Sequence, residues 1–451
     1  MADDSQFTRL GLFDARVPRY TSYPTAPQFA GGADPETHRA WISAIPEGSA
    51  ISLYLHVPFC RRLCWFCACR TQGTSSDDPV RAYVAVLTAE LALLKAALPA
   101  GVVLSRLHWG GGTPTLLQPD LIGALARAIF DVVPLGPGAE FSVEIDPNEV
   151  DAARLDALAE AGMNRASIGV QDFDPAIQKT IGREQSFEVT EEATEGLRAR
   201  GIRSLNADIL FGLPHQSNER IARSVRKLLS LRPDRVALYG YAHVPWMARR
   251  QMMIPSDALP RPSERLKLFE VARDLFLADG YREIGIDHFA LPEDGLARAA
   301  DSGRLRRNFQ GYTDDQAETL IGVGASSISR FPQGYSQNSA STSTHTKAIR
   351  DGAFSTARGH VFSQDDKLRG RIIEALMCDF RVSNDELMAR FDVGAPGIEA
   401  LCATARATFG DMVEIGPEGF AIPERARPLT RMIARTFDAY DQSKARHSQA
   451  V

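Results

Sequence analysis

Residues 51–69 read ISLYLHVPFCRRLCWFCAC, and this stretch decides the fold. Its first seven residues alternate between an apolar face with Leu53, Leu55 and Val57 and a polar face with Ser52, Tyr54 and His56. Alternation with a period of two predicts a half-buried β-strand. Four cysteines follow this strand at once. The stretch therefore predicts a strand that ends in a loop rich in metal or redox ligands.

The same strand pattern recurs further along the chain. Six more short runs of this kind lie at 104–109, 140–146, 165–171, 204–210, 235–241 and 283–287, and amphipathic runs typical of helices lie between most of them, as at 80–94, 151–161 and 221–231. Alternating strands and helices indicate parallel strands joined by right-handed crossovers, hence an α/β sheet or barrel. Polar residues on one face of the strands, such as Glu144 and Asp208, favour a barrel with a polar interior. An antiparallel sheet with one solvated face is the alternative, and the intervening helices argue against it.

The spacing of the cysteines bears on what the loop could bind. Cys60, Cys64, Cys67 and Cys69 lie within ten residues, whereas a disulfide framework spreads its cysteines to close larger loops. Four sulfurs could bind zinc, but the single residue between Cys67 and Cys69 is awkward for adjacent ligands of one tetrahedral ion. Three thiolates could instead surround an iron–sulfur cubane and leave one iron open. We therefore favour an iron–sulfur cluster over zinc, and zinc over a disulfide.

The composition sets limits on the class of protein. The chain has 451 residues, 44 % hydrophobic and 24 % charged, which is typical of a soluble globular protein of about three domains. No apolar run reaches the roughly 18 residues of a membrane span, and no secretory signal is visible. A net charge of −5 without a long basic run argues against general nucleic-acid binding. Clustered cysteines make the cytoplasm the expected location, and Cys378 and Cys402 are expected to be ordinary buried thiols.

Changes of pattern suggest four segments. Residues 1–48 are expected to form an extended arm, 49–330 the barrel, 331–362 a linker and 363–451 a mainly helical domain. In the last segment, helical runs at 367–380 and 384–391 precede a hairpin at 412–423, which suggests a winged-helix-like domain. Residues 361–451 contain 12 Lys and Arg against 14 Asp and Glu, a net charge of −2 that does not suit phosphate binding. We expect a cover over the barrel and not a reader of DNA.

Several motifs together are similar to a known family. Residues 60–67 (CRRLCWFC), with an aromatic residue before the third cysteine, resemble the signature of radical S-adenosylmethionine (SAM) enzymes. The extra Cys69 and the segments YLHVPFC (54–60), HWGGGTPT (108–115) and NFQGY (308–312) closely resemble the oxygen-independent coproporphyrinogen III oxidase family. The three-cysteine motif specifies only the superfamily, whereas its combination with Cys69 and residues 308–312 is much more specific. The resemblance runs from Arg19 to the C-terminal region.

The resemblance implies a radical SAM partial (β/α)6 barrel, a [4Fe-4S] cluster held by Cys60, Cys64 and Cys67, and SAM on the open iron. The residues that match SAM contacts of the family are Tyr54, Phe66, Gly111, Gly112, Thr113, Glu144, Gln171, Arg183, Asp208, Ala242 and Ile328. Cys69, Phe309 and Gln310 are candidate catalytic residues, the last two as contacts to a second SAM molecule. Residues 309–311 follow the last strand predicted above, where ligand loops of a barrel gather.

The activity that the resemblance implies is radical decarboxylation of coproporphyrinogen III. An electron from the cluster splits SAM, and the resulting 5′-deoxyadenosyl radical takes a hydrogen from a propionate. Loss of CO2 and one electron leaves a vinyl group, and two rounds give protoporphyrinogen IX. Expected partners are this substrate and an electron donor such as a flavodoxin or ferredoxin, with no nucleic acid, and a monomer is expected. Arginine pairs well with carboxylates, and the candidates are Arg19, Arg61, Arg62, Arg70, Arg183, Arg306 and Arg307.

Two other functions remain open at this point. The related haem chaperone family also carries the three-cysteine motif, but it generally lacks the extra cysteine and the segment NFQGY that this chain has. A nucleic-acid-binding regulator with a redox cluster and a winged helix is a third hypothesis. The net charge of −2 in residues 361–451 counts against it.

Overall fold

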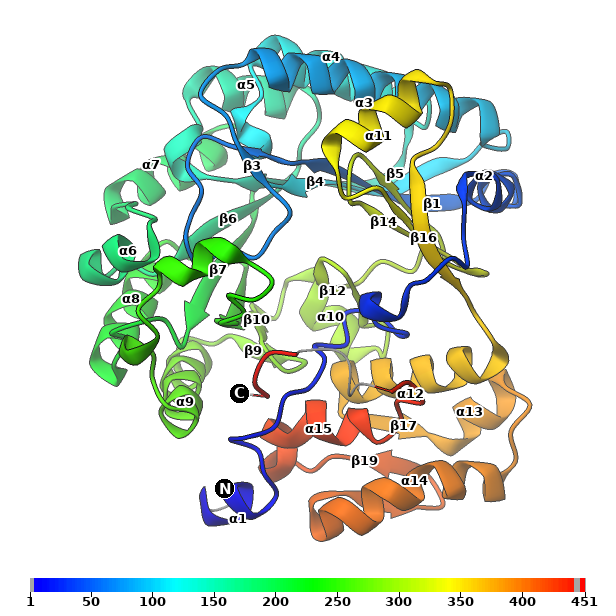
Figure 1. Cartoon of the computed structure of the whole chain (residues 1–451). Coiled ribbons are helices and arrows are strands. Elements are labelled where there is room, and N and C mark those ends of the chain that lie inside the picture. Colours follow the sequence, from blue (N-terminus) through cyan, green and yellow to red (C-terminus); the bar gives the residue numbers. More distant parts are fainter. Residues whose placement is uncertain (1–3, 442–446, 451) are drawn as a thin grey trace.

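The computed structural model describes residues 4–441 and 447–450. One sheet of twelve strands, in the order β16-β15-β14-β13-β1-β4-β5-β6-β7-β8-β10-β9, forms its centre. Six neighbouring strands of this sheet are parallel and follow the order of the chain: β1 (Ala50–Val57), β4 (Val103–Gly111), β5 (Leu135–Ile145), β6 (Arg165–Gln171), β7 (Ser204–Phe211) and β8 (Arg235–Gly240). Figure 1 shows them as a curved wall with β16 and β9 at the two ends of the sheet. The predicted partial barrel is confirmed.

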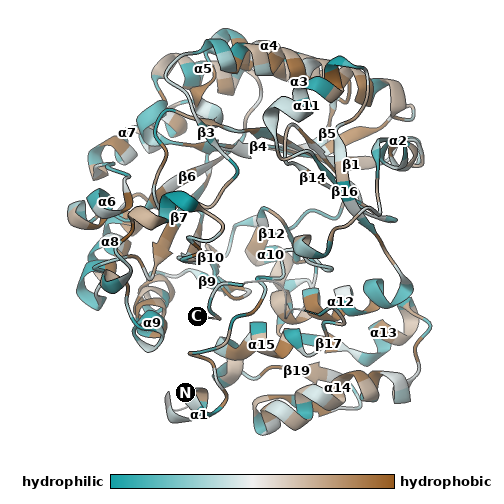
Figure 2. Cartoon of the chain, in the orientation of Figure 1, coloured by the Kyte–Doolittle hydropathy of each residue, from teal (hydrophilic) through white to brown (hydrophobic). Residues whose placement is uncertain are grey.

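Helices that connect these strands cover the outside of the wall. They are α3 (Asp78–Ala97), α4 (Pro119–Phe130), α5 (Ala152–Glu160), α6 (Pro175–Ile181), α7 (Phe187–Ala199), α8 (Asn218–Ser230) and α9 (Pro262–Ala278). In α8, Ile221, Val225 and Leu228 are buried at a helical spacing. Each such buried side chain contributes about 1.5–3 kcal/mol relative to exposure. Figure 2 shows hydrophilic and hydrophobic residues alternating along the outer helices.

The predicted strand at 283–287 is shorter than expected. β9 (Arg282–Ile284) ends early, and the chain turns back into the antiparallel β10 (His288–Ala290). Gly285 makes this turn with φ +56°, and a Cβ on it would overlap the ring of Tyr312. The alternation in the sequence gave no sign of this reversal. Because it brings Asp287 next to β8, it matters for the cavities described below.

Residues 309–311 do not follow the last strand, which corrects the prediction. They join β11 (Arg306–Asn308) to β12 (Gly311–Thr313), and four further strands of the main sheet come after them. These are β13 (Leu320–Val323), β14 (Ile328–Phe331), β15 (Gly334–Asn338) and β16 (Thr356–Val361). β13 pairs in parallel with β1, so it extends the wall on the side opposite β8.

Residues 331–362, expected to be a linker, contribute β15, α11 (Thr342–Arg350) and β16. The expected arm at 1–48 contains α1 (Asp4–Arg9) and α2 (Pro35–Ser43). Helix α2 begins at a favourable cap, since the Asp34 side chain accepts a hydrogen bond from the N–H of Thr37. The segments are thus more structured than the sequence suggested, and the division into domains stays a prediction.

The C-terminal part is mainly helical and has a small antiparallel sheet. Its elements are α12 (Gln364–Asp379), β17 (Arg381–Ser383), α13 (Asn384–Arg390), α14 (Ala395–Phe409), β18 (Glu414–Gly416), β19 (Gly419–Ala421) and α15 (Thr430–Arg435). The strands pair in the order β17-β19-β18. The β18–β19 hairpin follows helices α13 and α14 in the chain, which is the predicted winged-helix-like arrangement.

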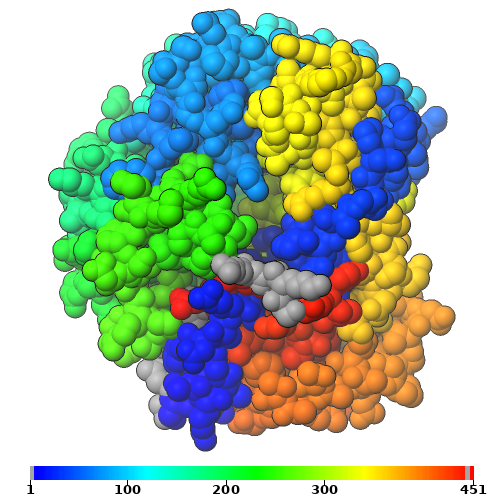
Figure 3. All heavy atoms as spheres, in the orientation of Figure 1, coloured from blue at the N-terminus to red at the C-terminus, as the bar shows by residue number. Residues whose placement is uncertain are grey.

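Two apolar cores hold these layers together. The larger core lies between the wall and its outer helices, and the second lies within the C-terminal part. Phe7, Leu12, Tyr20 and Tyr23 of the N-terminal arm belong to the second core. In Figure 3 the arm, in blue, crosses between the barrel and the C-terminal part. No helix of the described residues is long and apolar enough to cross a membrane.

Candidate functional site

Polar side chains line the inside of the barrel. A cavity of about 140 Å³ lies there, and its lining includes Glu144 on β5, Asp208 on β7 and Tyr239 on β8. Glu144 accepts a hydrogen bond from the N–H of Gly111 at 3.1 Å, and its other oxygen lies 3.3 Å from Nε2 of His108. Burial raises the pKa of Asp208 to about 7. A polar ligand in this cavity would lie next to several hydrogen-bond acceptors.

The glycine triplet at the end of β4 leaves no room for side chains. Gly111 has φ +113°, and a Cβ on it would lie 2.6 Å from the ring of His56. A Cβ on Gly112 would lie 2.5 Å from the carbonyl oxygen of Phe59. The N–H of Gly112 and of Thr113 donate instead to backbone oxygens of Val57 and Phe59, at 2.7 and 2.9 Å. The turn therefore packs its backbone directly on the start of the cysteine loop.

A short pair of strands closes the cysteine loop. β2 (Phe59–Cys60) pairs with β3 (Gln72–Gly73), and Cys64, Cys67 and Cys69 lie between them. All four are free thiols, with Cys69 exposed and the other three half-buried. Hydrogen bonding between Cys67 and Cys69 lowers the pKa of the Cys67 thiol and raises that of Cys69. The loop thus presents several sulfurs at the C-terminal end of β1.

Distant segments fix the backbone of this loop. The Trp65 N–H donates to the carbonyl of Ile181 on α6 at 2.9 Å, and Gln251 Nε2 donates to the carbonyl of Phe66 at 2.6 Å. Arg250 Nη2 donates to the carbonyl of Cys69 at 3.3 Å. Sequence reasoning missed Arg250 and Gln251, because nothing in their local sequence indicates a contact so far along the chain.

Arg183 places a positive charge beside the cysteine loop. Its Nη1 lies 3.2 Å from a carboxylate oxygen of Asp146 and 3.7 Å from Sγ of Cys64, and its Nη2 donates to the carbonyl of Gly169 at 3.0 Å. Burial would lower the pKa of Arg183, but Asp146 and Cys64 raise it above the ordinary value. Its Nε is buried and has no hydrogen-bond partner among the described residues. That N–H could donate to a bound ligand.

These features fit an iron–sulfur cluster with a small cofactor. Among residues 4–441 and 447–450, no three His, Cys, Asp or Glu side chains converge on one point where a single metal ion would bind. In a cubane each of the three thiolates binds a different iron, so the ligands surround the cluster and do not converge on one point. Cys60, Cys64 and Cys67 could supply the thiolates, Arg183 a compensating charge and Gly110–Gly112 a turn without side chains. Cys378 and Cys402 are buried elsewhere, as predicted.

The remaining predicted SAM contacts lie at the same end of the barrel. Tyr54 on β1 stacks on His108, with ring centroids 5.8 Å apart, and Gln171 ends β6 with φ +67°. Ala242 follows β8, and its carbonyl accepts a hydrogen bond from Gln251 Nε2 at 3.0 Å. Ile328 begins β14 beyond the loop that follows β13. The C-terminal ends of the parallel strands thus bring together residues from widely separated parts of the chain.

Phe309 and Gln310 separate in the structure. Gln310 lines the barrel cavity together with Glu144 and Asp208. Phe309 instead lines a second cavity of about 380 Å³, where its ring meets Tyr335 edge-on at 5.6 Å and Phe29 at 6.5 Å. The two residues were predicted to act together, whereas the structure places only Gln310 beside the predicted SAM contacts.

Comparison with known proteins agrees with this geometry. A sequence profile of the radical SAM superfamily matches residues 54–228. The oxygen-independent coproporphyrinogen III oxidase of Paracoccus denitrificans is 66 % identical over 451 residues and covers 100 % of both chains. The protein of that name from Cereibacter sphaeroides is 64 % identical over 443 residues, 98 % of both chains. The solved structure of coproporphyrinogen III oxidase from Escherichia coli, a radical SAM enzyme, has a TM-score of 0.90 at 33 % identity, over 95 % of this chain and 100 % of that one.

This chain belongs to the oxygen-independent coproporphyrinogen III oxidase family.

The seven arginines that the sequence offered to this family's site lie in different places. Arg61 forms an ion pair with Asp77, and Arg62 and Arg70 are exposed. Arg183 lies beside the cysteine loop. Arg306 lines the second cavity. Arg19 and Arg307 line a third and larger cavity, where Arg265 and Arg431, which sequence reasoning missed, accompany them.

Proposed function

We propose that this protein converts coproporphyrinogen III to protoporphyrinogen IX by oxidative decarboxylation of two propionates to vinyl groups. The observation that carries the proposal is the full-length similarity to coproporphyrinogen III oxidases together with the cysteine loop packed on a side-chain-free glycine turn. No observation on this chain favours the haem chaperone. The oxidase is therefore the function that the site supports best.

Cys60, Cys64 and Cys67 would hold a [4Fe-4S] cluster, because they are half-buried free thiols on one closed loop. When bound, the cluster and SAM supply the radical that starts the reaction. The glycine turn at 111–112 would fix the backbone beside SAM, since it packs directly on the start of the cysteine loop. The buried Nε–H of Arg183, which has no partner among the described residues, could donate to SAM.

Other side chains of this chain would orient the cofactor and exclude water. Glu144, fixed by the Gly111 N–H and by His108, offers acceptors to the amine of SAM. Asp208, fixed by a 2.8 Å hydrogen bond from Asn206 Nδ2, faces the same cavity. Tyr54, Phe66, Thr113, Gln171, Ala242 and Ile328 complete the proposed contacts.

A second SAM molecule is part of the proposal, with Gln310 as its contact, because Gln310 lines the barrel cavity. Phe309 stays a proposed contact to this second SAM only because it belongs to the same strand hairpin as Gln310. Cys69 is proposed as a catalytic thiol, since it is exposed and lies beside Cys67. Its backbone is fixed from outside the loop by Arg250.

The remaining proposals concern location and partners. We propose a cytoplasmic monomer that receives electrons from a flavodoxin or a ferredoxin. Exposed cations beside the cysteine loop, Arg62 and Arg70, support an acidic protein donor. Clustered free cysteines support a reducing compartment.

The proposal is tested by SAM cleavage. Anaerobically reconstituted protein with reductant should release methionine and 5′-deoxyadenosine, and addition of coproporphyrinogen III should increase the rate. Haem is the comparison ligand in a parallel binding assay. Stable haem capture without any substrate-dependent cleavage would support the chaperone and contradict the oxidase.

A further inference from the structure

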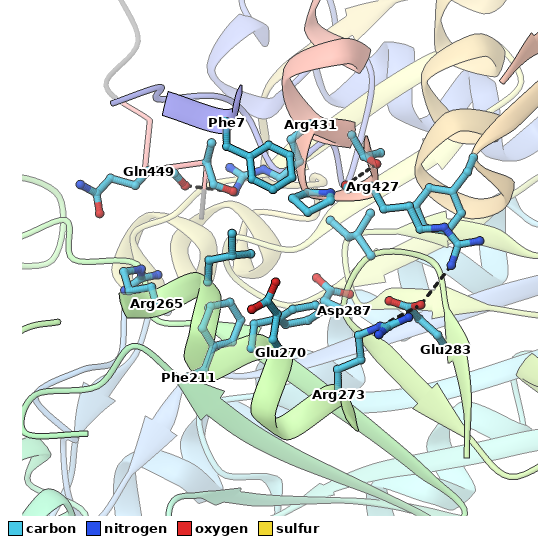
Figure 4. A pocket seen from close by; sticks show the side chains of 18 of the residues that line it. Phe7, Phe211, Arg265, Glu270, Arg273, Glu283, Asp287, Arg427, Arg431 and Gln449 are labelled. Atoms are coloured by element: carbon cyan, nitrogen blue, oxygen red, sulfur yellow. Dashed lines mark hydrogen bonds and ion pairs between the residues drawn. The ribbon is translucent and has the colours of Figure 1, made fainter. Parts of the chain in front are cut away.

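A further cavity lies between the barrel and the C-terminal part. It has a volume of about 640 Å³, within the range of small-molecule sites. Its walls come from the N-terminal arm, the C-terminal ends of β7 and β8, α9, the β9–β10 turn and the segment around α15. Figure 4 shows this cavity, with Phe7 and Phe211 on opposite walls. It therefore lies at the C-terminal ends of β7 and β8, the strand that carries Asp208 and the strand that precedes Ala242.

Positive charge dominates the lining. Seven arginines and five carboxylates of the described residues line the cavity. Glu283 lies between Arg273 and Arg427 at 3.3 and 3.0 Å, and Arg273 also contacts Glu424 at 3.2 Å. Figure 4 shows this paired group at one side of the cavity. Arg425 lies 3.8 Å from a carboxylate oxygen of Asp411, and the remaining guanidiniums are those of Arg19, Arg265, Arg307 and Arg431.

One of these arginines has unused donors, and a second has no ion-pair partner among the described residues. Arg307 is almost fully buried, with 5 % of its side chain exposed, and its Nε and Nη1 have no hydrogen-bond partner among the described residues. Its nearest carboxylate, Asp287, lies 3.8 Å from Nη1. Arg19 donates to the carbonyl of Gly240 at 2.6 Å and forms no ion pair with residues 4–441 or 447–450. Burying such charges is costly unless an anion balances them.

Large apolar side chains form another part of the lining. Phe7, Phe211, Leu266, Phe269, Ile286 and Phe380 contribute to it. A purely ionic ligand would gain nothing from these rings, and a purely apolar one would leave Nε and Nη1 of Arg307 without partners among the described residues. The lining fits a flat, apolar ligand that carries carboxylates at its edge.

The geometry points to a binding site for the tetrapyrrole itself, in which Arg19 and Arg307 hold propionates that do not react. This inference rests on the proposed function, and it identifies the part of the protein that would bind the carboxylates of the substrate. The ring system would lie against Phe211 and Phe269, with the reacting propionate directed towards the ends of β7 and β8. Arg307 can reach the ligand from the hairpin that also carries Gln310.

The test measures binding without turnover. Coproporphyrin III, the stable oxidised form with the same carboxylates, is titrated by fluorescence into anaerobically reconstituted protein without SAM or reductant. The tetramethyl ester of coproporphyrin III is the probe that lacks the charges. We expect the ester to bind at least about ten-fold more weakly, and Arg19→Gln and Arg307→Gln each to weaken the acid about ten-fold or more.

Further variants make the outcome specific. Arg19→Lys keeps the charge but not the forked donors, so its affinity for the acid should lie between those of the wild type and Arg19→Gln. Arg282→Gln is the matched control, because Arg282 on β9 is exposed, pairs with Asp301 and does not line the cavity. Arg307 packs on the Tyr312 ring, and if Arg307→Gln fails to fold, Arg19→Gln decides alone. Arg282→Gln should bind the acid as the wild type does.

The outcomes separate this inference from the proposed function. Unchanged affinity of folded Arg19→Gln for the acid, or equal affinity of the wild type for acid and ester, would overturn the site. If such a protein still converted coproporphyrinogen III, the proposed function would stand without the site. Binding that depends on the arginines in a protein that never converts the substrate would keep the site and refute the function.

Discussion

Phe309 and Gln310 are neighbours in the chain, yet they line different cavities. Both residues belong to the tight turn between β11 and β12. The N–H of Gln310 donates to Oδ1 of Asn308 at 2.9 Å, which fixes its backbone in the turn. At the scale of single residues, position along the chain is therefore a poor guide to which of two candidates reaches the site.

The first prediction concerns Gln310. Gln310→Ala should keep the iron content of the wild type and reduce formation of protoporphyrinogen at least about ten-fold, because a loosened geometry impairs hydrogen abstraction. Phe309→Leu is the comparison, since it keeps an apolar side chain in the second cavity and should cost less activity. Product analysis from coproporphyrinogen III measures both variants. Unchanged turnover of Gln310→Ala would remove this residue from the site.

The second prediction concerns the cysteines. Cys60→Ser, Cys64→Ser and Cys67→Ser should each lose both the cluster and SAM cleavage, because three thiolates are the minimum anchor for a cubane. Cys69→Ser should retain the cluster, as its exposed thiol is not among the three proposed ligands. Iron and sulfide analysis with visible absorption after reconstitution checks this. A folded Cys69→Ser protein without a cluster would contradict the ligand assignment.

At the scale of elements, a buried carboxyl group joins helix α3 to the strands beside it. Glu90 accepts hydrogen bonds from the N–H of Gly324 and from Nδ2 of Asn338, both at 2.8 Å. Nε2 of His345 on α11 lies 3.4 Å away, and burial lowers the pKa of His345 to about 4. Burial also raises the pKa of Glu90 from 4.5 to about 8. Glu90 thus fixes the loop between β13 and β14, just before Ile328.

The third prediction follows from that pKa. Folded protein keeps a proton on Glu90 that unfolded protein loses above pH 4.5, so the free energy of unfolding should fall as the pH rises towards 8. Glu90→Gln cannot ionise and keeps only one of the two acceptors, so its free energy of unfolding should not fall between pH 6 and pH 9, whereas that of the wild type should fall by about 1–3 kcal/mol. Urea unfolding at pH 6 and pH 9 measures this, with the exposed Glu192→Gln on α7 as control. Equal pH dependence in the wild type and Glu90→Gln would contradict the burial argument.

The elements also show what the sequence could and could not predict. β6 occupies 165–171 as predicted, because its alternation of apolar and polar residues is regular. β15 (GYSQN) and β16 (TARGHV) were missed, since they have few apolar residues and their neighbours in the sheet stabilise them. Helix α2 was missed because it is only nine residues long and buries only His38 and Ile42.

Some parts of the candidate site could likewise be predicted from the sequence, and others could not. The cysteine loop and the glycine turn could be found because their residues are adjacent in the chain. Contacts such as Gln251 to Phe66 and Arg250 to Cys69 join positions far apart, so only the fold reveals them. The same holds for the cavity that collects Arg19, Arg265, Arg307 and Arg431 from four segments.

At the scale of the whole molecule, the two ends of the chain meet. Arg431 on α15 donates to the carbonyls of Pro18 and Gln449, at 3.1 and 3.0 Å, and Arg16 pairs with Gln449 in a β-bridge. Figure 3 shows the arm between barrel and C-terminal part. The arm and the C-terminal part therefore close the large cavity together, which agrees with the expected role of that part as a cover.

The fourth prediction concerns oxygen and belongs to the molecule as a whole. A cubane with one iron that lacks a protein ligand is open to oxidation, and Cys69 shows that this loop reaches solvent. Air should therefore bleach the reconstituted protein and abolish turnover, and anaerobic addition of iron and sulfide should restore both. Absorption and product formation are followed together. Full activity of air-purified protein without reconstitution would contradict a radical mechanism.

The most direct test of the central claim is product formation under strict anaerobiosis. Reconstituted protein, SAM and a one-electron reductant are incubated with coproporphyrinogen III, and the products are oxidised and identified by mass spectrometry. The account predicts protoporphyrin IX, formed by loss of two carboxyl groups, in wild-type protein and none in Cys64→Ser. Protein that carries the cluster and cleaves SAM, but leaves coproporphyrinogen III unchanged, would contradict the account.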